Sequence, residues 1–417
     1  MSGRDGRAVA VLGTLDTKAA ECGYVRDRLL HAGLRPVVVD CGVYEPDASC
    51  SVAPDVPRTE VARAAGHDTA ALARAGNRGA AVTAMAEGAR ATVLRLRAEG
   101  RLDAALAVGG TGGTSIAAHA LRALPLGVPK VAVSTAASGD TRPYVAESDL
   151  VLMPSVVDVA GLNSVSARIL ANACGAVAGM MAAPPPEYRA AGPAVAASMF
   201  GVTTPAVTRA RRLLEERGRE VLVFHMTGIG GRTLESLVDQ GALNGVLDLT
   251  TTELADELAG GVMSAGPTRL TCGGPGTPRV VSVGALDMVN FGAADTVPER
   301  FGGRLLHVHN PAVTLMRTCA EECAQLGARL AERVAALEAP AAVVLPLRGI
   351  SALSVDGGPF HAPAADAELF AAVRAGLEGT GVRLVELDTE INDPKFADTA
   401  VGLLDDLMRA SAHTKGD

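Results

Sequence analysis

The sequence predicts an α/β protein of two doubly wound, Rossmann-like domains, whose mostly parallel sheets face a common cleft. Short apolar runs alternate with segments of helical spacing, as in parallel sheets covered by helices on both faces. Several of these runs end in glycine-rich or polar turns. A run of three prolines at 184–186 interrupts the pattern near the middle of the 417 residues, and such a run forms a stiff spacer. We therefore expect a nucleotide-binding domain over 1–185 and a second α/β domain, on the substrate or partner side, over 190–417.

The first half alternates apolar and amphipathic segments in the order that a parallel sheet requires. Residues 50–77 are polar and weakly patterned, so no element is predicted there. The spacing predicts strands over 8–12, 36–40, 103–109, 130–134 and 149–153, and helices from about 15 to 31, over 78–99, from about 111 to 121 and over 164–181.

The second half repeats the architecture without repeating the sequence. A connection rich in turns is expected over 284–292, and a long helix is expected from about 311 to 337. The remaining pattern predicts strands over 195–200, 220–224, 246–249, 279–283, 305–308, 341–346 and 382–387, and helices over 204–217, 370–377 and 396–408.

Composition excludes several classes of function. Hydrophobic residues make up 48% of the chain, which supports a large core, whereas aromatic residues make up 3% and tryptophan is absent. A net charge of −8 argues against a nucleic-acid partner. No run of eighteen apolar residues predicts a membrane span, the N-terminus leads directly into a strand pattern, and the seven cysteines include no CxxC pair. We expect a cytoplasmic protein with reduced thiols that does not bind membranes.

The strongest candidate for a ligand loop follows the predicted strand at 103–109. Glycines allow a tight turn and close approach to a ligand, and the first N–H groups of the next helix favour an anion. The loop is neither a Walker A motif nor a GxGxxG motif, and a plain connection remains the alternative. The candidate phosphate-binding residues are Gly109, Gly110, Thr111, Gly112, Gly113 and Thr114.

Two further loops at the same predicted sheet edge each pair an acid with a base. Asp16 and Asp140 are candidate ligands of Mg²⁺, which takes one or two carboxylates together with phosphate oxygens. A helix-capping acid beside a solvated lysine is the alternative for the first loop, and a solvated acid is the alternative for Asp40 at the end of its strand. The candidate nucleotide-binding residues on these segments are Gly13, Thr14, Asp16, Lys18, Asp40, Ser138, Gly139, Asp140 and Arg142.

The second domain carries candidates for proton transfer and substrate binding. His225 precedes a glycine-rich turn, and His309 ends a short strand, where an imidazole can act as a general base or bind phosphate. A tetrahedral metal site of His307, His309, Cys319 and Cys323 is a weaker alternative, because closed zinc sites show tighter paired spacings. The candidate catalytic residues are His225, Arg232, Asp287, Asn290 and His309.

Motifs along the chain resemble the Tm-one-like ATP-binding domain family, in the same order over nearly the entire length. They include GTLDTK, GGTGGT, STAASGD, HMTGIGGRTLE, GALDMVNFG and HNPAVTLMRT. The resemblance implies two α/β subdomains, ATP with Mg²⁺, and a homodimer. Cys323 and Glu390 depart from the family pattern, at positions where asparagine and histidine are expected.

The residues and the resemblance together predict an ATP-binding protein with Mg²⁺. We expect an enzyme that phosphorylates or adenylates a small acidic or carbonyl metabolite at the cleft between its domains. An ATP-dependent binding or regulatory module without turnover is the alternative. The resemblance supplies a ligand, and it does not supply a reaction.

Overall fold

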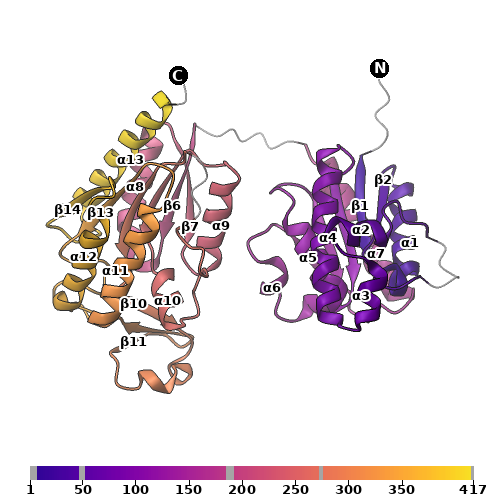
Figure 1. Cartoon of the computed structure of the whole chain (residues 1–417), viewed down its shortest axis with the longest axis horizontal. Coiled ribbons are helices and arrows are strands. Elements are labelled where there is room, and N and C mark those ends of the chain that lie inside the picture. The colour runs from indigo at the N-terminus through magenta and orange to yellow at the C-terminus, as the bar shows by residue number, and fades with distance from the viewer. Residues whose placement is uncertain (1–6, 47–51, 185–191, 272–275, 415–417) are drawn as a thin grey trace. The chain divides into compact units, whose positions relative to one another are not determined.

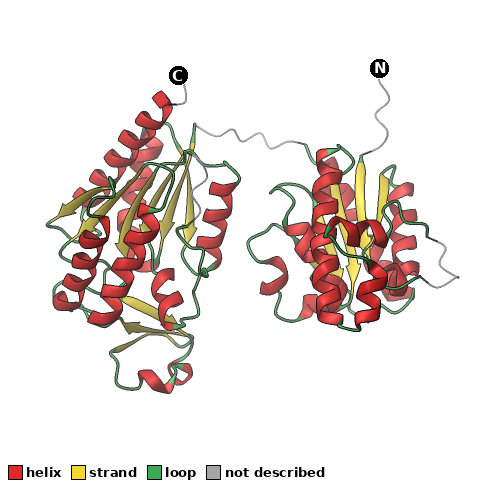
Figure 2. Ribbon diagram, in the orientation of Figure 1, coloured by secondary structure: helices red, strands yellow, loops and turns green. Residues whose placement is uncertain are grey.

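The computed structural model describes residues 7–46, 52–184, 192–271 and 276–414. The chain divides into two compact units, Met1–Pro186 and Glu187–Asp417. Each unit is an α/β domain with an all-parallel main sheet, so the predicted fold class is confirmed (Figures 1 and 2).

The first unit is built on a five-stranded parallel sheet in the order β2-β1-β3-β4-β5. Strands β1 and β3 are buried along their whole length and are almost entirely apolar, as expected of strands covered on both faces. Helices α1 and α7 pack on one face of the sheet, and α2, α4 and α5 pack on the other. The strands are β1 Ala8–Gly13, β2 Arg35–Asp40, β3 Ala104–Gly109, β4 Lys130–Ser134 and β5 Val151–Pro154. The helices are α1 Leu15–His31, α2 Arg58–Ala64, α3 Thr69–Ala75, α4 Arg78–Ala98, α5 Thr111–Arg122, α6 Arg142–Val145 and α7 Ser164–Ala182.

The strand order of the first unit reverses direction between β1 and β3. The chain passes from β1 to β2 on one side, and β3 to β5 extend on the other side. In open parallel sheets, ligands bind at the carboxyl ends of the strands that flank such a reversal. The loops after β1 and β3 are therefore the expected walls of a ligand site.

The second unit contains a six-stranded parallel sheet in the order β14-β13-β9-β8-β6-β7 and an antiparallel sheet in the order β10-β12-β11. One face of the large sheet packs against α9, α10, α11 and α12, and the other packs against α8 and α13. Its strands are β6 Ala194–Met199, β7 Glu220–His225, β8 Gly245–Thr250, β9 Arg279–Gly284, β13 Ala341–Pro346 and β14 Arg383–Leu387. The antiparallel strands are β10 Met288–Phe291, β11 Leu306–Asn310 and β12 Val313–Arg317. The helices are α8 Thr204–Glu216, α9 Ile229–Asp239, α10 Glu253–Ala259, α11 Ala320–Ala335, α12 Pro363–Leu377 and α13 Pro394–Thr414.

The long helix expected from 311 to 337 is wrong in its first third. Residues Val313–Arg317 form β12, which pairs with β10 and β11, and the helix begins only at Ala320. Cys319 caps that helix together with the side chain of Glu322. The segment 284–292, expected to be rich in turns, contains β10, and the weakly patterned segment before α4 contains α2 and α3.

Among the described helices, α7 is long and apolar enough to cross a membrane by length and composition, with a mean hydropathy of 1.3. Core helices of soluble proteins pass the same test. Leu170, Ala173 and Val177 of α7 pack into the core between α1 and the sheet. This buried stripe is the one expected of a helix that covers a sheet.

Candidate functional site

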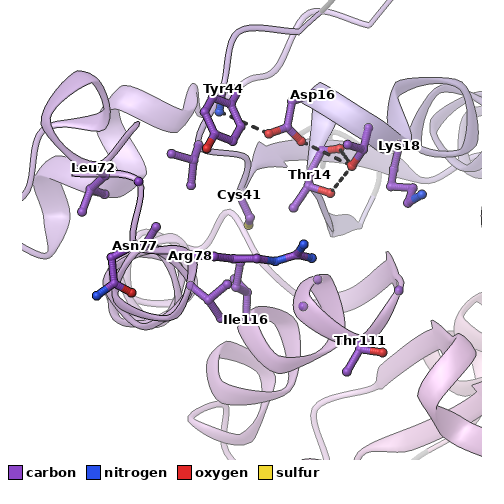
Figure 3. A pocket seen from close by; sticks show the side chains of 18 residues that line it. Thr14, Asp16, Lys18, Cys41, Tyr44, Leu72, Asn77, Arg78, Thr111 and Ile116 are labelled. Carbon is purple, nitrogen blue, oxygen red and sulfur yellow. Dashed lines mark hydrogen bonds between the residues drawn. The ribbon is translucent and has the colours of Figure 1, made fainter. Parts of the chain in front are cut away.

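A pocket of about 470 Å³ lies at the carboxyl ends of β1 and β3 in the first unit. Its size falls within the usual range of sites for small molecules. The loop after β1, the loop after β2, the corner between α3 and α4, and the start of α5 supply its walls (Figure 3). Its lining residues are Thr14, Asp16, Thr17, Lys18, Cys41, Val43, Tyr44, Leu72, Gly76, Asn77, Arg78, Ala81, Val82, Gly110, Thr111, Gly112, Gly113 and Ile116.

The glycine-rich loop forms one wall of this pocket. Helix α5 begins at Thr111, has no acidic residue in its first turn and receives no hydrogen bond from a side-chain cap. Gly110, Thr111, Gly112 and Gly113 line the pocket at this helix end. The first N–H groups of a helix have no partner within the helix, and the helix dipole places positive charge there. This wall therefore offers donors and positive potential to an anion.

Arg78 adds a guanidinium to the same wall. It is the first residue of α4, and among the described residues its side chain has no hydrogen bond or ion pair. A Cβ built on Gly112 would lie 3.6 Å from Nη2 of Arg78, so the guanidinium lies directly beside the α5 terminus. Figure 3 shows the Arg78 side chain lying across the pocket, with its head toward the side of Thr111 and Thr14. Sequence reasoning missed this residue.

The signal that could have identified Arg78 is its position in the helix. A positive charge at the positive end of a helix dipole is unfavourable, and the first turn of α4 carries no acidic residue to offset it. Asn77 caps the helix by accepting a hydrogen bond from Ala80 N at 3.1 Å. A local rule broken in this way is expected at functional sites.

The opposite wall carries Asp16, the one carboxylate among the described lining residues. Its Oδ2 accepts a hydrogen bond from Tyr44 N at 3.2 Å, and its Oδ1 accepts one from Thr17 Oγ1 at 3.3 Å. Lys18 also lines the pocket, but its ammonium donates to the carbonyl oxygen of Val159 in the loop after β5. Of the cationic side chains that the described part of the chain brings to this pocket, Arg78 is therefore the one free to meet a ligand.

The other predicted residues of the first unit lie outside the pocket lining. Gly13 and Gly109 end their strands where a Cβ would lie 2.3 Å from Sγ of Cys22 and 2.9 Å from the carbonyl carbon of Gly113. Asp40 is buried, and its Oδ1 accepts hydrogen bonds from Leu15 N at 3.1 Å and Gly42 N at 2.9 Å. Burial raises the pKa of Asp40 above its usual value. These residues shape the strand ends beneath the pocket.

The loop after β4 also stays outside the lining. Thr114 lies within hydrogen-bonding distance of Ser134, with 2.6 Å between the two hydroxyl oxygens, and so ties α5 to β4. Asp140 accepts two hydrogen bonds from the guanidinium of Arg142, at 2.9 and 2.8 Å, and this pairing lowers the pKa of Asp140. Ser138 and Gly139 lie at the end of a short 3₁₀ helix in the same loop. The acid and the base of this loop neutralise each other.

In the second unit, a carboxylate of the chain itself accepts the hydrogen bonds that the glycine-rich turn offers. Glu253 is buried, and its Oε1 accepts hydrogen bonds from Gly228 N at 2.7 Å and Gly231 N at 3.0 Å, at the start of α9. Its Oε2 accepts a hydrogen bond from Nε of Arg269 at 2.7 Å. A side-chain carboxylate thus occupies the place where an anionic ligand would contact this turn.

The candidate catalytic residues of the second unit divide into buried and exposed side chains. Asp287 is fully buried and accepts a hydrogen bond from Ser351 Oγ at 2.7 Å, and burial raises its pKa to about 6. Asn290 is also fully buried and donates to Oδ2 of Asp256 at 2.7 Å. His225 and His309 are exposed, at the end of β7 and on β11.

The remaining catalytic candidate of that unit and one candidate metal ligand also have partners within the protein. Arg232 lies on α9 and donates to the carbonyl oxygen of Ser264 at 3.3 Å. Cys323 is buried beside Thr318, with 3.3 Å between Sγ and Oγ1. Within the described ranges, no group of three His, Cys, Asp or Glu side chains is arranged to hold a metal ion, so the tetrahedral alternative finds no support.

Comparison with known proteins places the chain in a family. Residues 7–186 match the N-terminal domain, and residues 192–408 the C-terminal domain, of the family described as "Uncharacterised protein family (UPF0261)". A UPF0261 protein of Clostridium tetani is 44% identical over 392 residues, which cover 94% of this chain and 96% of that protein. A UPF0261 protein of Rhizobium meliloti is 46% identical and covers 96% and 99% of the two chains.

A plant relative shares part of this similarity. The tomato protein named ToMV resistance protein Tm-1(GCR237) is 41% identical over 345 residues, which cover 81% of this chain and 46% of the tomato protein. Both halves of the chain match the family's two domains, and the bacterial relatives match over nearly their whole length. The chain therefore belongs to the UPF0261 family.

Proposed function

We propose that the first unit binds ATP together with Mg²⁺ in the pocket at the carboxyl ends of β1 and β3. The observation that carries the proposal is the open start of α5 beside the guanidinium of Arg78, which has no ion-pair or hydrogen-bond partner among the residues that the structure describes. The α4 terminus at the same pocket also lacks an acid in its first turn. Helix termini and arginine are both common binding partners of phosphate groups. The phosphates would lie along this wall.

Asp16 is suited to bind Mg²⁺. Mg²⁺ in nucleotide sites is usually held by one or two carboxylates and by the phosphates themselves. Asp16 supplies one carboxylate on the wall that faces the α5 terminus, whereas Asp140 lies outside the lining and is paired with Arg142. Mg²⁺ would neutralise phosphate charge in this pocket. We propose Asp16 alone as the metal ligand of the first unit.

We further propose that the chain is an ATP-dependent enzyme acting on a small acidic or carbonyl metabolite, as a cytoplasmic homodimer. Phosphoryl transfer depends mainly on positioning and on stabilisation of phosphate charge, so it requires no covalent nucleophile. The exposed imidazoles of His225 and His309 are available to a substrate. A regulatory module without turnover is the second candidate, favoured by the full burial of Asp287 and Asn290, which keeps both from a substrate.

The binding proposal is tested by calorimetric titration of ATP with Mg²⁺ into Gly112→Val and Arg78→Met variants. A side chain at Gly112 has ordinary contact distance to Arg78 and enters the phosphate wall, so we expect a folded protein without measurable ATP binding. Loss of one charge-assisted contact should weaken binding by roughly tenfold to a hundredfold in Arg78→Met. If both variants keep the wild-type affinity, the phosphate wall is assigned wrongly.

Matched controls separate the site from general effects on helices. Arg90 is exposed on the same helix as Arg78 and lies outside the pocket, so Arg90→Met should bind ATP as the wild type does. Gly175→Val on α7, where a Cβ would meet nothing within 4 Å, controls for valine in a helix. Formation of ADP or AMP in the presence of a metabolite pool would distinguish phosphoryl from adenylyl transfer. Binding without either product would favour the regulatory module.

A further inference from the structure

The end of the pocket away from the phosphate wall is apolar. Val43 and Leu72 line it, and each is only partly buried. In Figure 3, Leu72 lies at one side of the pocket, with Thr14 and Thr111 on the other side. A ligand that filled both regions would need a charged end and a flat or apolar end. A nucleotide has this combination, whereas inorganic phosphate and small carboxylates do not.

Tyr44 contributes an aromatic ring to the same pocket. Tyr44 is 61% exposed although its ring carries a large apolar surface. Among the described residues, the structure gives its hydroxyl no hydrogen-bond partner. Aromatic rings exposed in this way are the usual stacking surfaces for nucleobases, because every base has a π-face. The ring is therefore available to a ligand without loss of an existing contact.

The backbone fixes the place of Tyr44 in relation to the phosphate wall. Tyr44 N donates to Oδ2 of Asp16, and a Cβ on Gly42 would lie 3.0 Å from Cγ of Asp16. The loop after β2 is thus held against the first turn of α1 by one carboxylate. A ligand bound to Asp16 through Mg²⁺ would lie next to the residues that position this ring.

Leu72 reaches the pocket from a segment that a minimal doubly wound fold does not need. Helices α2 and α3 are inserted between β2 and α4, and α3 is followed by Gly76, whose φ of 64° turns the chain sharply into α4. Leu72 on α3 and Asn77 before α4 then line the pocket within one corner. The same corner carries Arg78. The α3–α4 corner therefore supplies contacts to both ends of the pocket.

We propose that Tyr44 and Leu72 bind the base of the nucleotide, with Tyr44 stacking on the ring and Leu72 covering it from the α3 side. This inference rests on the proposed function and adds a recognition element to it. The loop after β2 and the α3–α4 corner select ligands that carry an aromatic base. Inorganic phosphates of equal charge contact only the wall formed by α5 and Arg78.

The test compares ATP with inorganic tripolyphosphate, both with Mg²⁺, in calorimetric titrations of the full chain. In Tyr44→Ala we expect ATP affinity to fall about tenfold, in line with the loss of one base stack, and tripolyphosphate affinity to stay unchanged. Tyr44→Phe keeps the ring and should bind ATP within about twofold of the wild type. Leu72→Ala should resemble Tyr44→Ala with a smaller loss.

The outcomes separate this inference from the proposed function. If wild-type ATP affinity is measurable and Tyr44→Ala retains it, the base contact is wrong and the phosphate wall stands. If Tyr44→Ala weakens both ligands equally, Tyr44 shapes the loop and does not stack on a base, which also overturns the inference. If the wild type binds neither ligand, the proposed function itself is wrong. Thermal unfolding of each variant confirms that Tyr44→Ala, an exposed position, leaves the fold intact.

Discussion

Loss of the proton of Asp256 is expected to make the second unit less stable as the pH rises from 5 to 8. Asp256 lies on α10, is fully buried, and burial raises its pKa from 3.8 to about 7. It accepts hydrogen bonds from Asn290 Nδ2 at 2.7 Å and Met263 N at 3.1 Å, which favour the charged form but do not outweigh burial. The nearby carboxylate of Glu253 raises the pKa further.

The sign follows from the order of the two pKa values. In the folded state Asp256 keeps a proton that the unfolded chain loses near pH 3.8. Its contribution to stability is therefore complete below pH 3.8 and is lost as the pH rises through about 7. The gap of about three pH units, at about 1.4 kcal/mol per unit, gives a loss of about 4 kcal/mol at most.

Hydrogen exchange followed by mass spectrometry can measure this loss of stability in the segments around Asp256. Peptides covering α10 and β10 report on the elements that Asp256 joins, after correction for the intrinsic pH dependence of exchange. The Asp256→Asn variant has no titrating group at this position. The free energy of local opening of α10 and β10 should therefore fall less with rising pH in this variant than in the wild type. Other carboxyl groups with shifted pKa values, such as Asp287, titrate in both proteins and cancel in the difference. An identical pH dependence in both proteins would show that Asp256 stays ionised and that its donors outweigh burial.

Two further predictions concern the buried charges around Glu253. Arg269→Met leaves Asp248, which accepts hydrogen bonds from both terminal nitrogens of Arg269 at 2.7 and 2.6 Å, as an uncompensated buried charge. Measured by urea denaturation at pH 7, the free energy of unfolding of the second unit should fall by about 3–5 kcal/mol in this variant. The fall should be smaller near pH 4, where Asp248 of the variant can take up a proton. A fall below about 1 kcal/mol at pH 7 would refute this account. Gly231→Ala should lower the unfolding temperature of the same unit, because its Cβ would lie 1.9 Å from Oε2 of Glu253, whereas Gly175→Ala on the open face of α7 should not. Equal unfolding temperatures for the two alanine variants in a thermal scan would contradict the close packing of Glu253 against α9.

The sequence predicted the main sheets well because buried parallel strands are continuous apolar runs. Strands β1, β3 and β8 lie where those runs were found. The strand Val313–Arg317 was missed because its stability comes from pairing with β10 and β11, and such non-local contacts leave little periodic signal in five residues. Helices α2 and α3, of seven residues each, are too short to show helical periodicity.

The candidate site was predicted in part, and the missed part has a physical reason. Residues of the glycine loop and of the loop after β1 were expected together because strands of one parallel sheet end at the same edge. Arg142 was a candidate nucleotide-binding residue because its loop carries an acid and a base, Asp140 and Arg142. The two lie so close in the sequence that their side chains pair with each other. Arg78 lies far along the chain from both loops and enters the pocket only through the α3–α4 corner.

The contrast between two glycine-rich turns separates a structural helix start from one that is open to a ligand. At the start of α9 the chain supplies its own anion, since Glu253 accepts hydrogen bonds from Gly228 and Gly231 and is balanced by Arg269. Within the described ranges, the first turn of α5 carries no acidic residue and receives no side-chain cap, and Arg78 adds positive charge where the helix dipole already provides it. Positive charge gathered at the start of a helix is unfavourable, and a bound anion would offset it. We therefore propose that phosphate binds at the glycine-rich turn that begins α5, and not at the one that begins α9.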